Sequence, residues 1–233
     1  VYKAYTKDLC GYAERGEKEW RRLLGSFFAE GVNIAVVKND EGQIEGYAVY
    51  RLGAPEIPVT EFVYTTRRAQ RGLLNYFYNH RSQGESIRWN EGLHDTGYRF
   101  VPDGKTGHTT MPYMMARIVD VETALTTVPV NLEAVMMPIT LNIKVTDTLC
   151  DWNHGVFALS LGESTLPNVK RISAESVDEI DITIDIGGLT VLLMGAVSAK
   201  ELVFEGKLQG ESHWIDYLDM VYPKQNTYIN EWW

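Results

Sequence analysis

The sequence has few of the residues and patterns that mark metal-binding or disulfide-linked proteins. Its two cysteines, Cys10 and Cys150, lie far apart and have no CxxC motif or histidine-rich neighbours. Cysteines in such a setting indicate neither a disulfide framework nor a zinc site. The five histidines also lack the HxH and HExxH spacings that hold metal ions. We therefore expect no metal in this chain.

Long hydrophobic runs are absent as well. The longest, "IGGLTVLLMGAV", is about a dozen residues long, whereas a membrane helix needs about 18–20. The start of the chain, Val1-Tyr2-Lys3, leads into a polar stretch and does not resemble a signal peptide. We expect a cytoplasmic protein without a membrane partner. Because the first residue is not Met, we also expect an excised piece of a longer protein.

Positive charge is scarce in this chain. Its 22 Lys and Arg residues are outnumbered by 31 Asp and Glu residues, which gives a formal net charge of −9. A nucleic-acid-binding surface needs clustered Lys and Arg. We therefore expect no nucleic-acid partner, and the acidic balance favours a cationic ligand.

The first half of the chain mixes helical and strand patterns. An amphipathic pattern predicts a helix over 16–28, and two β-rich runs joined by the turn 39–42 predict a hairpin. A third strand leads into a helix that Thr66 caps, and a strand over 86–92 follows. This order is typical of α+β domains with helices over a mostly antiparallel sheet. We assign it to a first domain, residues 1–118.

The second half predicts another α+β unit, with strands first and helices after them. Asp120 caps a short helix, and Ser198 with Glu201 forms a capping box at the start of a later one. Isoleucines at every second position over 180–186 predict a strand with one buried face, and the aspartates between them predict a solvated face. The second domain covers residues 119–233.

Several motifs carry a resemblance to a known family. The stretch "DEIDITIDIGGLTVLLMGAVSAKELVFEGKLQG" is similar to the sterol-carrier pattern of a strand, a leucine-bearing helix, a glycine and a second helix. In the first half, "EGYAVYRL" and "VTEFVYTTRRAQRGLLNYFYNH" resemble the central domain of the enhanced-intracellular-survival (Eis) family of acetyltransferases. The chain is identified as a member of that family, covering a degenerate GNAT-like domain and a sterol-carrier-like domain.

The resemblance implies an architecture and an activity. Members have three parts, so the N-terminal catalytic GNAT domain, which holds acetyl-CoA, would lie upstream of Val1 and be a missing partner of this chain. The intact enzyme would transfer acetyl from acetyl-CoA to a small cationic amine, such as an aminoglycoside, or to a lysine side chain. We expect the 233-residue chain itself to be inactive and to belong to a homo-oligomer.

The residues that would hold the cofactor are not present in the expected place. GNAT enzymes use an R/Q-x-x-G-x-G/A run that enters a helix and presents backbone N–H groups to the pyrophosphate. The corresponding stretch from Thr65 to Leu74 has Ala69 three residues before Gly72 and Leu74 two residues after it. Counted from Gln70 instead, the glycine position holds Leu73, whose Cβ hinders the close approach that glycine permits. We therefore expect no cofactor in this chain, with acetyl-CoA bound only by the intact enzyme.

The chain ends in two indoles, and the resemblance gives them a role. It implies that the C-terminal carboxylate, here that of Trp233, is the catalytic base, and we expect Glu231 and Trp232 to line the substrate site. Two alternatives stay open: Trp232 and Trp233 could simply seal the edge of a core, and Glu231 could be a solvated tail charge.

Other readings of the sequence compete with the enzyme. A sterol-carrier-type second half could bind a lipid or another apolar ligand, with "VLLMGAV" and "ELVFEG" lining a tunnel, and both domains could be purely architectural. We interpret Asp178, Asp181 and Asp185 as a solvated strand face rather than metal ligands. The residues His94, Asp95 and His108 are interpreted as parts of a surface loop.

Overall fold

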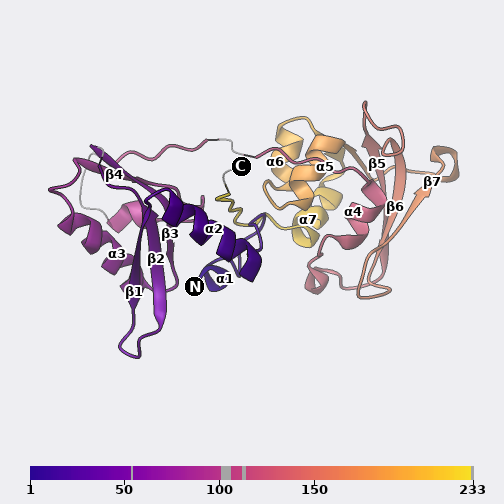
Figure 1. Ribbon diagram of the computed structural model, residues 1–233. Coiled ribbons are helices and arrows are strands. Elements are labelled where there is room, and N and C mark those ends of the chain that lie inside the picture. Colours follow the sequence, from indigo (N-terminus) through magenta and orange to yellow (C-terminus); the bar gives the residue numbers. More distant parts are fainter. Residues whose placement is uncertain (54, 101–105, 112–113, 232–233) are drawn as a thin grey trace. The chain divides into compact units, whose positions relative to one another are not determined.

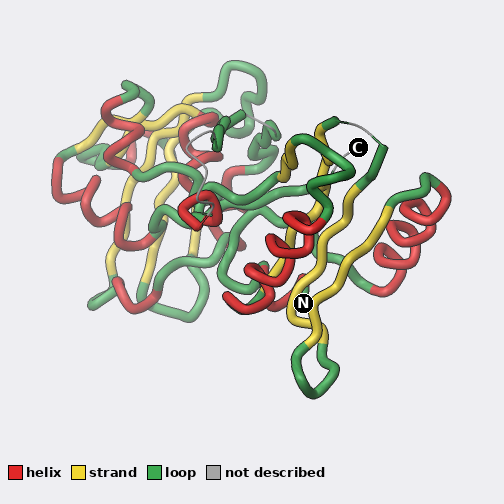
Figure 2. Tube along the Cα trace, turned by 90° about the vertical axis from the view of Figure 1, so that its left-hand side faces the viewer, coloured by secondary structure: helices red, strands yellow, loops and turns green. Residues whose placement is uncertain are grey.

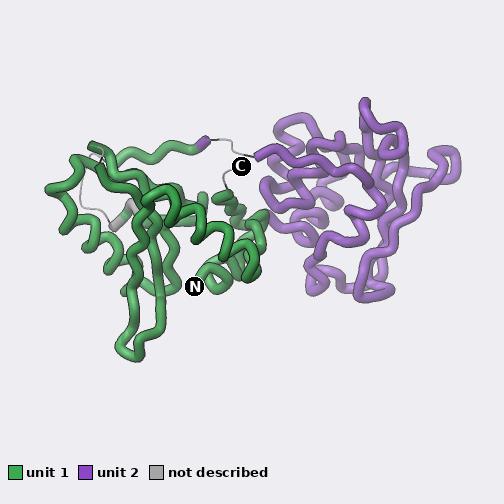
Figure 3. Tube along the Cα trace, in the orientation of Figure 1, with its two compact units in different colours: residues 1–110, 226–233 green, residues 111–225 purple. Residues whose placement is uncertain are grey.

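The chain folds into two compact units (Figure 3), which a computed structural model describes at residues 1–53, 55–100, 106–111 and 114–231. Unit 1 comprises residues 1–110 and 226–233, and unit 2 comprises residues 111–225. The α+β fold class expected from the sequence is confirmed, because each unit combines one sheet with helices. None of the described helices is long and apolar enough to cross a membrane.

Unit 1 contains a four-stranded sheet in the order β1-β2-β3-β4. Its strands are β1 (Asn33–Lys38), β2 (Ile44–Tyr50), β3 (Glu56–Tyr64) and β4 (Ser86–Trp89). The first three pair antiparallel, which confirms the predicted hairpin, whose loop projects from the sheet in Figure 2. The last two pair in parallel because α3 (Arg67–Asn79) crosses over between them.

Both faces of this sheet are covered (Figure 1). The helix α3 packs Leu73 and Phe77 against one face, and Thr66 caps it as predicted, with its Oγ1 3.1 Å from the Ala69 N–H that donates to it. The other face meets α1 (Tyr2–Tyr5) and α2 (Glu17–Ala29). The helix α2 forms where its amphipathic pattern predicts it, yet none of its residues is fully buried and Phe28 is 74% exposed.

Unit 2 contains a five-stranded sheet in the order β7-β6-β5-β8-β9. Its strands are β5 (Ile139–Thr146), β6 (Gly155–Leu161), β7 (Asn168–Ile172), β8 (Ile182–Asp185) and β9 (Leu208–Gly210). Only β5 and β8 pair in parallel within this sheet, as its described residues show. The isoleucines of β8 are buried as predicted. The aspartates beside them are half-buried, because Asp181 accepts from the Asn142 N–H and Asp185 caps the next helix.

Four α-helices and the sheet share the core of unit 2. They are α4 (Val121–Thr127), α5 (Ile186–Leu193), α6 (Ala199–Phe204) and α7 (Ser212–Val221). Short 3-10 turns form in this unit at η2 (Leu132–Ala134) and η3 (Ala174–Ser176), and in unit 1 at η1 (Gly97–Phe100). The Asp120 cap and the Ser198–Glu201 capping box form as predicted. Apolar side chains from all four helices meet those of the sheet in one cluster, which buries them from water.

Candidate functional site

The last described residues of the chain lie on unit 1 rather than on unit 2, which they follow in sequence (Figure 3). The Cys10 N–H donates to the Asn226 carbonyl, and the Tyr228 N–H donates to the Cys10 carbonyl, each over 2.9 Å. The Asn230 amide donates to the Thr60 carbonyl over 2.7 Å. Residues 226–231, which we call the tail, are therefore joined to both the N-terminal segment and strand β3.

A buried ion network holds the end of this tail. The Arg15 Nε lies 2.6 Å from Glu231 Oε1, and Arg15 Nη1 lies 2.9 Å from Glu61 Oε1. The side chains of Arg15, Glu61 and Glu231 are only 2%, 5% and 10% exposed. The Tyr47 hydroxyl donates to Glu61 Oε2 over 2.6 Å. One cation thus bridges two carboxylates away from water, in an arrangement that needs each polar atom to be hydrogen-bonded.

Aromatic rings enclose the guanidinium group of Arg15. Its central carbon lies 4.2 Å from the centre of the Tyr2 ring and 5.0 Å from that of Trp20. Burial by itself disfavours the charged form, but the hydrogen bonds to Glu61 and Glu231 leave the pKa of Arg15 above its usual value. Burial raises the pKa of Tyr2 to about 12. Arginine therefore stays charged and the tyrosine stays protonated at neutral pH.

The predicted site residues at the chain end have different outcomes. Trp232 and Trp233 lie outside the described residues. The alternative in which Glu231 is a solvated tail charge is wrong, because the residue is buried and bound to Arg15. Its contact with a substrate stays a prediction. Sequence reasoning missed Arg15 and Glu61, although a lone carboxylate inside the apolar run "IPVTEFVY" is a signal for a buried partner.

A second polar cluster lies near the ends of β3 and β4. The Tyr64 hydroxyl donates to Asp95 Oδ2 over 2.6 Å and receives a hydrogen bond from the Gln70 amide over 2.9 Å. The Gly97 N–H donates to Asp95 Oδ1 over 2.8 Å. Asp95 lies in a loop as interpreted, but its side chain is not at the surface: it is buried and anchors the loop to β3 through Tyr64. All of these contacts fix a loop conformation.

Two histidines accompany this cluster. The ring atom Nδ1 of His94 is buried without a hydrogen-bond partner among the described residues, and burial lowers the pKa of His94. The His108 Nε2 lies 3.6 Å from Glu91 Oε1, while the Trp89 indole donates to Glu91 Oε2 over 2.9 Å. Burial raises the pKa of Glu91. Among the described residues, no group of three or more His, Cys, Asp or Glu side chains could hold a metal ion.

The N-terminal end of α3 is occupied by groups of this chain. The Glu45 Oε2 accepts from the Thr66 hydroxyl over 3.1 Å and from Arg68 Nε over 3.3 Å. A Cβ on Gly72 would lie 3.1 Å from Val37 Cγ2, so this glycine allows α3 to pack closely against β1. A phosphate group at this helix end would need the Thr66 hydroxyl and the Arg68 guanidinium group as donors. Both are bound to Glu45 instead.

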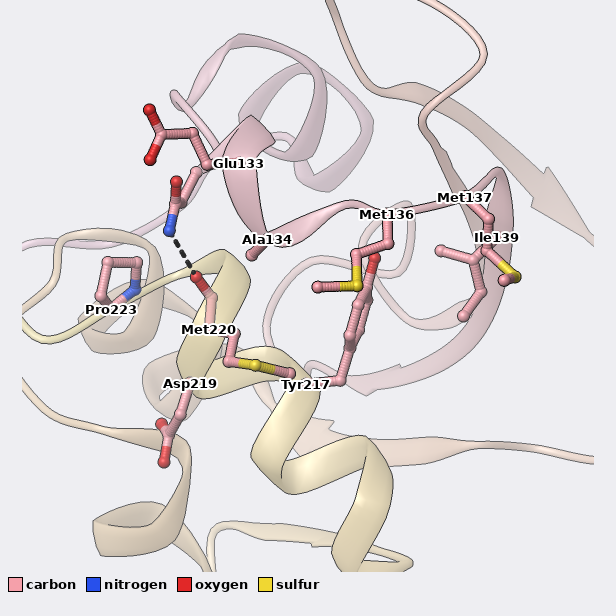
Figure 4. Close-up of a pocket in the computed structure, with 10 residues that line it drawn as sticks. Glu133, Ala134, Met136, Met137, Ile139, Tyr217, Asp219, Met220 and Pro223 are labelled. Atoms are coloured by element: carbon pink, nitrogen blue, oxygen red, sulfur yellow. Dashed lines mark hydrogen bonds between the residues drawn. The ribbon is translucent and has the colours of Figure 1, made fainter.

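A groove of about 600 Å³ opens in unit 2 between η2, the start of β5 and α7 (Figure 4). Its wall is mostly apolar, and Met136, which is 94% exposed, lies near Tyr217. The carboxylates of Glu133 and Asp219 lie at its edge. The helices α5 and α6, whose segments would line a tunnel in the lipid-binding alternative, do not line this groove. It can hold an apolar or amphipathic group.

Comparisons with known proteins agree with this two-unit division. Residues 11–118 match the acetyltransferase (GNAT) domain family, and residues 121–230 match the sterol carrier protein domain family. The two matches meet near residue 120, whereas the compact units divide between residues 110 and 111 and give the tail to unit 1. No curated protein matches the chain.

Solved structures share the fold at low sequence identity. A conserved protein of unknown function from Enterococcus faecalis, described as a probable N-acyltransferase, is 24% identical with a TM-score of 0.84 over 99% of this chain and 58% of its own. A GCN5-related N-acetyltransferase from Anabaena variabilis is 19% identical with a TM-score of 0.78, over 100% of this chain and 59% of its own. Eis1 from Mycobacterium abscessus is 20% identical with a TM-score of 0.66, over 96% of this chain and 56% of its own.

This chain thus spans less than three fifths of the length of these structures. The structural likeness extends over 96–100% of this chain, and the family matches leave only short stretches of it unassigned. The chain is a GNAT acetyltransferase-type domain followed by a sterol-carrier-type domain.

Proposed function

We propose that this chain is the C-terminal two-domain part of an Eis-type N-acetyltransferase, which moves an acetyl group from acetyl-CoA to a cationic amine. An aminoglycoside or a lysine side chain would be such an acceptor. The structural neighbours support the acetyl transfer, because they include an N-acetyltransferase and Eis1. Their length supports the idea of a part, because this chain spans only 56–59% of it. The observation that carries it is the tail held on the GNAT-type domain through Arg15 and Glu231.

In this proposal the residues after Glu231 reach the reacting amine, and the Trp233 carboxylate takes its proton. An α-carboxyl group normally titrates near about 3.3–3.7, which makes it a weak base, and removal from water raises its pKa. The terminal carboxylate is therefore useful only if it is held in an apolar place. Deletion of Trp233 from the acetyl-CoA-binding enzyme should lower kcat by about 10²–10⁴-fold, with the KM for acetyl-CoA unchanged. An unchanged kcat would contradict this role.

The proposal also places acetyl-CoA outside this chain. Its support is the α3 N-terminus, where Glu45 occupies the Thr66 hydroxyl and Arg68. Calorimetry with acetyl-CoA should give no binding heat for the 233-residue chain. Micromolar binding would show that the domain holds the cofactor itself.

A homo-oligomer is proposed as the working state. The exposed apolar side chains Leu24 and Phe28 on α2 support it, because such a helix face is usually covered by another surface. Light scattering after size exclusion should report more than one copy at micromolar concentration. A monomer at all concentrations would contradict the proposal.

The groove of unit 2 favours a second function, the binding of a lipid or another apolar ligand by the sterol-carrier-type domain. Native mass spectrometry of the purified chain would then detect a bound lipid. Met136→Glu, which adds a charge to the groove, should remove it, whereas Leu166→Glu at an exposed site away from the groove should not. Absence of lipid under native conditions would exclude this function.

A further inference from the structure

Few interactions hold the tail on unit 1. Residues 226–231 contain no helix or named strand, and their backbone contacts are those with Cys10. Three side chains add to these contacts: Tyr228 is buried against Tyr5, Asn230 reaches the Thr60 carbonyl and Glu231 reaches Arg15. The ion pair is the contact made by the last described residue, so it fixes the end of the described tail on unit 1.

The partner of Glu231 is fixed independently of the tail. Arg15 is bound to Glu61, and Glu61 also accepts from the Tyr47 hydroxyl, so these three side chains stay paired without Glu231. The rings of Tyr2 and Trp20 enclose the guanidinium group. Unit 1 therefore presents a preorganised socket, built of Arg15, Glu61 and Tyr47, in which one further carboxylate fits against the guanidinium group.

The exposures of these residues indicate how strong the contact is. Arg15 and Glu231 are nearly inaccessible to water, at 2% and 10%, whereas the surface pair of Arg21 and Glu17 is 79% exposed on both sides. Exposed pairs of this kind add little to stability. A hydrogen-bonded charge away from water adds about 1.5–3 kcal/mol, which corresponds to about 10- to 150-fold in an equilibrium.

We propose that Arg15 is a positioning residue, whose socket clamps Glu231 and thereby fixes the residues that follow it for the acetyl-transfer step. This inference rests on the proposed function for its catalytic consequence, but not for the clamp itself. Arg15 does not touch the reacting atoms in this scheme. It acts through the tail, by restricting the positions that the chain end can reach.

The clamp is tested first by amide hydrogen exchange on the 233-residue chain. Glu231→Gln keeps the shape of the side chain and removes its charge, and Glu17→Gln makes the same change in the exposed pair. In Glu231→Gln the Tyr228 amide, which donates to Cys10, should exchange about 10- to 100-fold faster. Amides of β2 and β3 should keep their wild-type rates in both variants.

Two outcomes of this experiment would overturn the clamp. Unchanged exchange at Tyr228 in Glu231→Gln would show that the ion pair does not hold the tail. Amide exchange in β2 and β3 that becomes faster by the same factor as at Tyr228 would show that the network stabilises the whole of unit 1 and does not position the tail specifically. The Glu17→Gln variant must behave as wild type, since its pair is exposed.

The catalytic consequence is tested on the acetyl-CoA-binding enzyme proposed above. Glu231→Gln should lower kcat about 10-fold or more and leave the KM for acetyl-CoA unchanged, and Glu231→Asp should restore part of the loss. If the tail amides are released but kcat is unchanged, the clamp stands and the role of the chain end in catalysis fails. If Tyr228 exchange is unaffected while deletion of Trp233 still lowers kcat, the clamp fails and the proposed function stands.

Discussion

At the scale of single residues, the chain depends on buried carboxylates that are paired with arginines. Arg15 joins Glu61 and Glu231 inside unit 1, and the exposed Arg117 lies 2.6 Å from the buried Asp147 in unit 2. A buried ion pair adds little compared with apolar residues of the same shape, but removal of one partner leaves a charge without compensation. Substitution of one partner should therefore cost more stability than the ion pair contributes.

Arg15→Met should destabilise unit 1 by about 3–5 kcal/mol, because Glu61 and Glu231 then face each other without a cation. Chemical denaturation followed by tryptophan fluorescence measures this loss. Combining the substitution with Glu61→Gln and Glu231→Gln should restore much of the stability, since no buried charge is left unpaired. A triple variant as unstable as Arg15→Met would show that lost packing, rather than charge, is responsible.

The carboxyl group of Asp147 should make the stability of unit 2 depend on pH. Burial opposes its charge, but hydrogen bonds from Leu149, Asn153, Cys150 and Arg117 lower its pKa from 3.8 to about 2. Because the folded-state pKa is the lower one, this stabilisation is present above about pH 4 and is lost as the pH falls towards about 2.

Thermal melts across this pH window measure the effect. Asp147→Asn should lower the melting temperature near neutral pH and flatten its fall below about pH 4. Asp178→Asn, at an exposed position, serves as the control and should follow the wild-type curve. If the melting temperature of Asp147→Asn falls with pH as steeply as that of the wild type, groups other than Asp147 cause the acid sensitivity.

At the scale of elements, the two long helices of unit 1 differ in how closely they contact the sheet. The helix α3 carries Gly72 against Val37 of β1 and Ala69 against Gly46 of β2. The helix α2 has Gly25 at a position where an added Cβ would meet no atom within 4 Å. Glycine thus permits close packing in α3, whereas in α2 it only weakens the helix.

Substitution of the two glycines should therefore have opposite effects. Gly72→Leu should cost about 1–3 kcal/mol, because its side chain has to displace Val37. Gly25→Ala should add about 0.5–1 kcal/mol through helix propensity. Urea unfolding of both variants measures the change in the free energy of unfolding and shows whether it falls for Gly72→Leu and rises for Gly25→Ala. A stabilised Gly72→Leu would contradict the tight contact between α3 and β1.

At the scale of the whole molecule, the chain order differs from the order of the folded units. The tail follows unit 2 in sequence and completes unit 1 in space, where Tyr228 is buried among aromatic residues of the N-terminal segment. Tyr228 lies 5.5 Å from Tyr5, measured between ring centres, in an edge-to-face contact. The two units are therefore not independent pieces that a single cut could separate.

Deletion of residues 226–233 should destabilise unit 1 by at least about 1.5–3 kcal/mol, the contribution of one large buried side chain. Amide exchange should become faster in β2 and β3 and stay unchanged in β5, β6 and β8 of unit 2. A deletion that affects both units equally, or neither, would contradict the assignment of the tail to unit 1.

The sequence by itself determined the local elements of this protein. The hairpin around 39–42, the Thr66 cap, the Ser198–Glu201 capping box and the buried isoleucines of β8 all form as predicted. Each depends on residues within a few positions of one another, or on a repeat of two residues, so a short window of sequence contains the whole cause.

Only the tertiary structure decided the candidate site. A bulge beside Thr60 turns Glu61 to the face of Tyr47 and Val63, whereas Ile57 and Val59 face the other side. Arg15 then meets carboxylates 46 and 216 positions away in the chain. No local pattern specifies such pairs, because strand register and the return of the tail bring them together. The burial that gives the ion pair its strength exists only once the whole unit has folded.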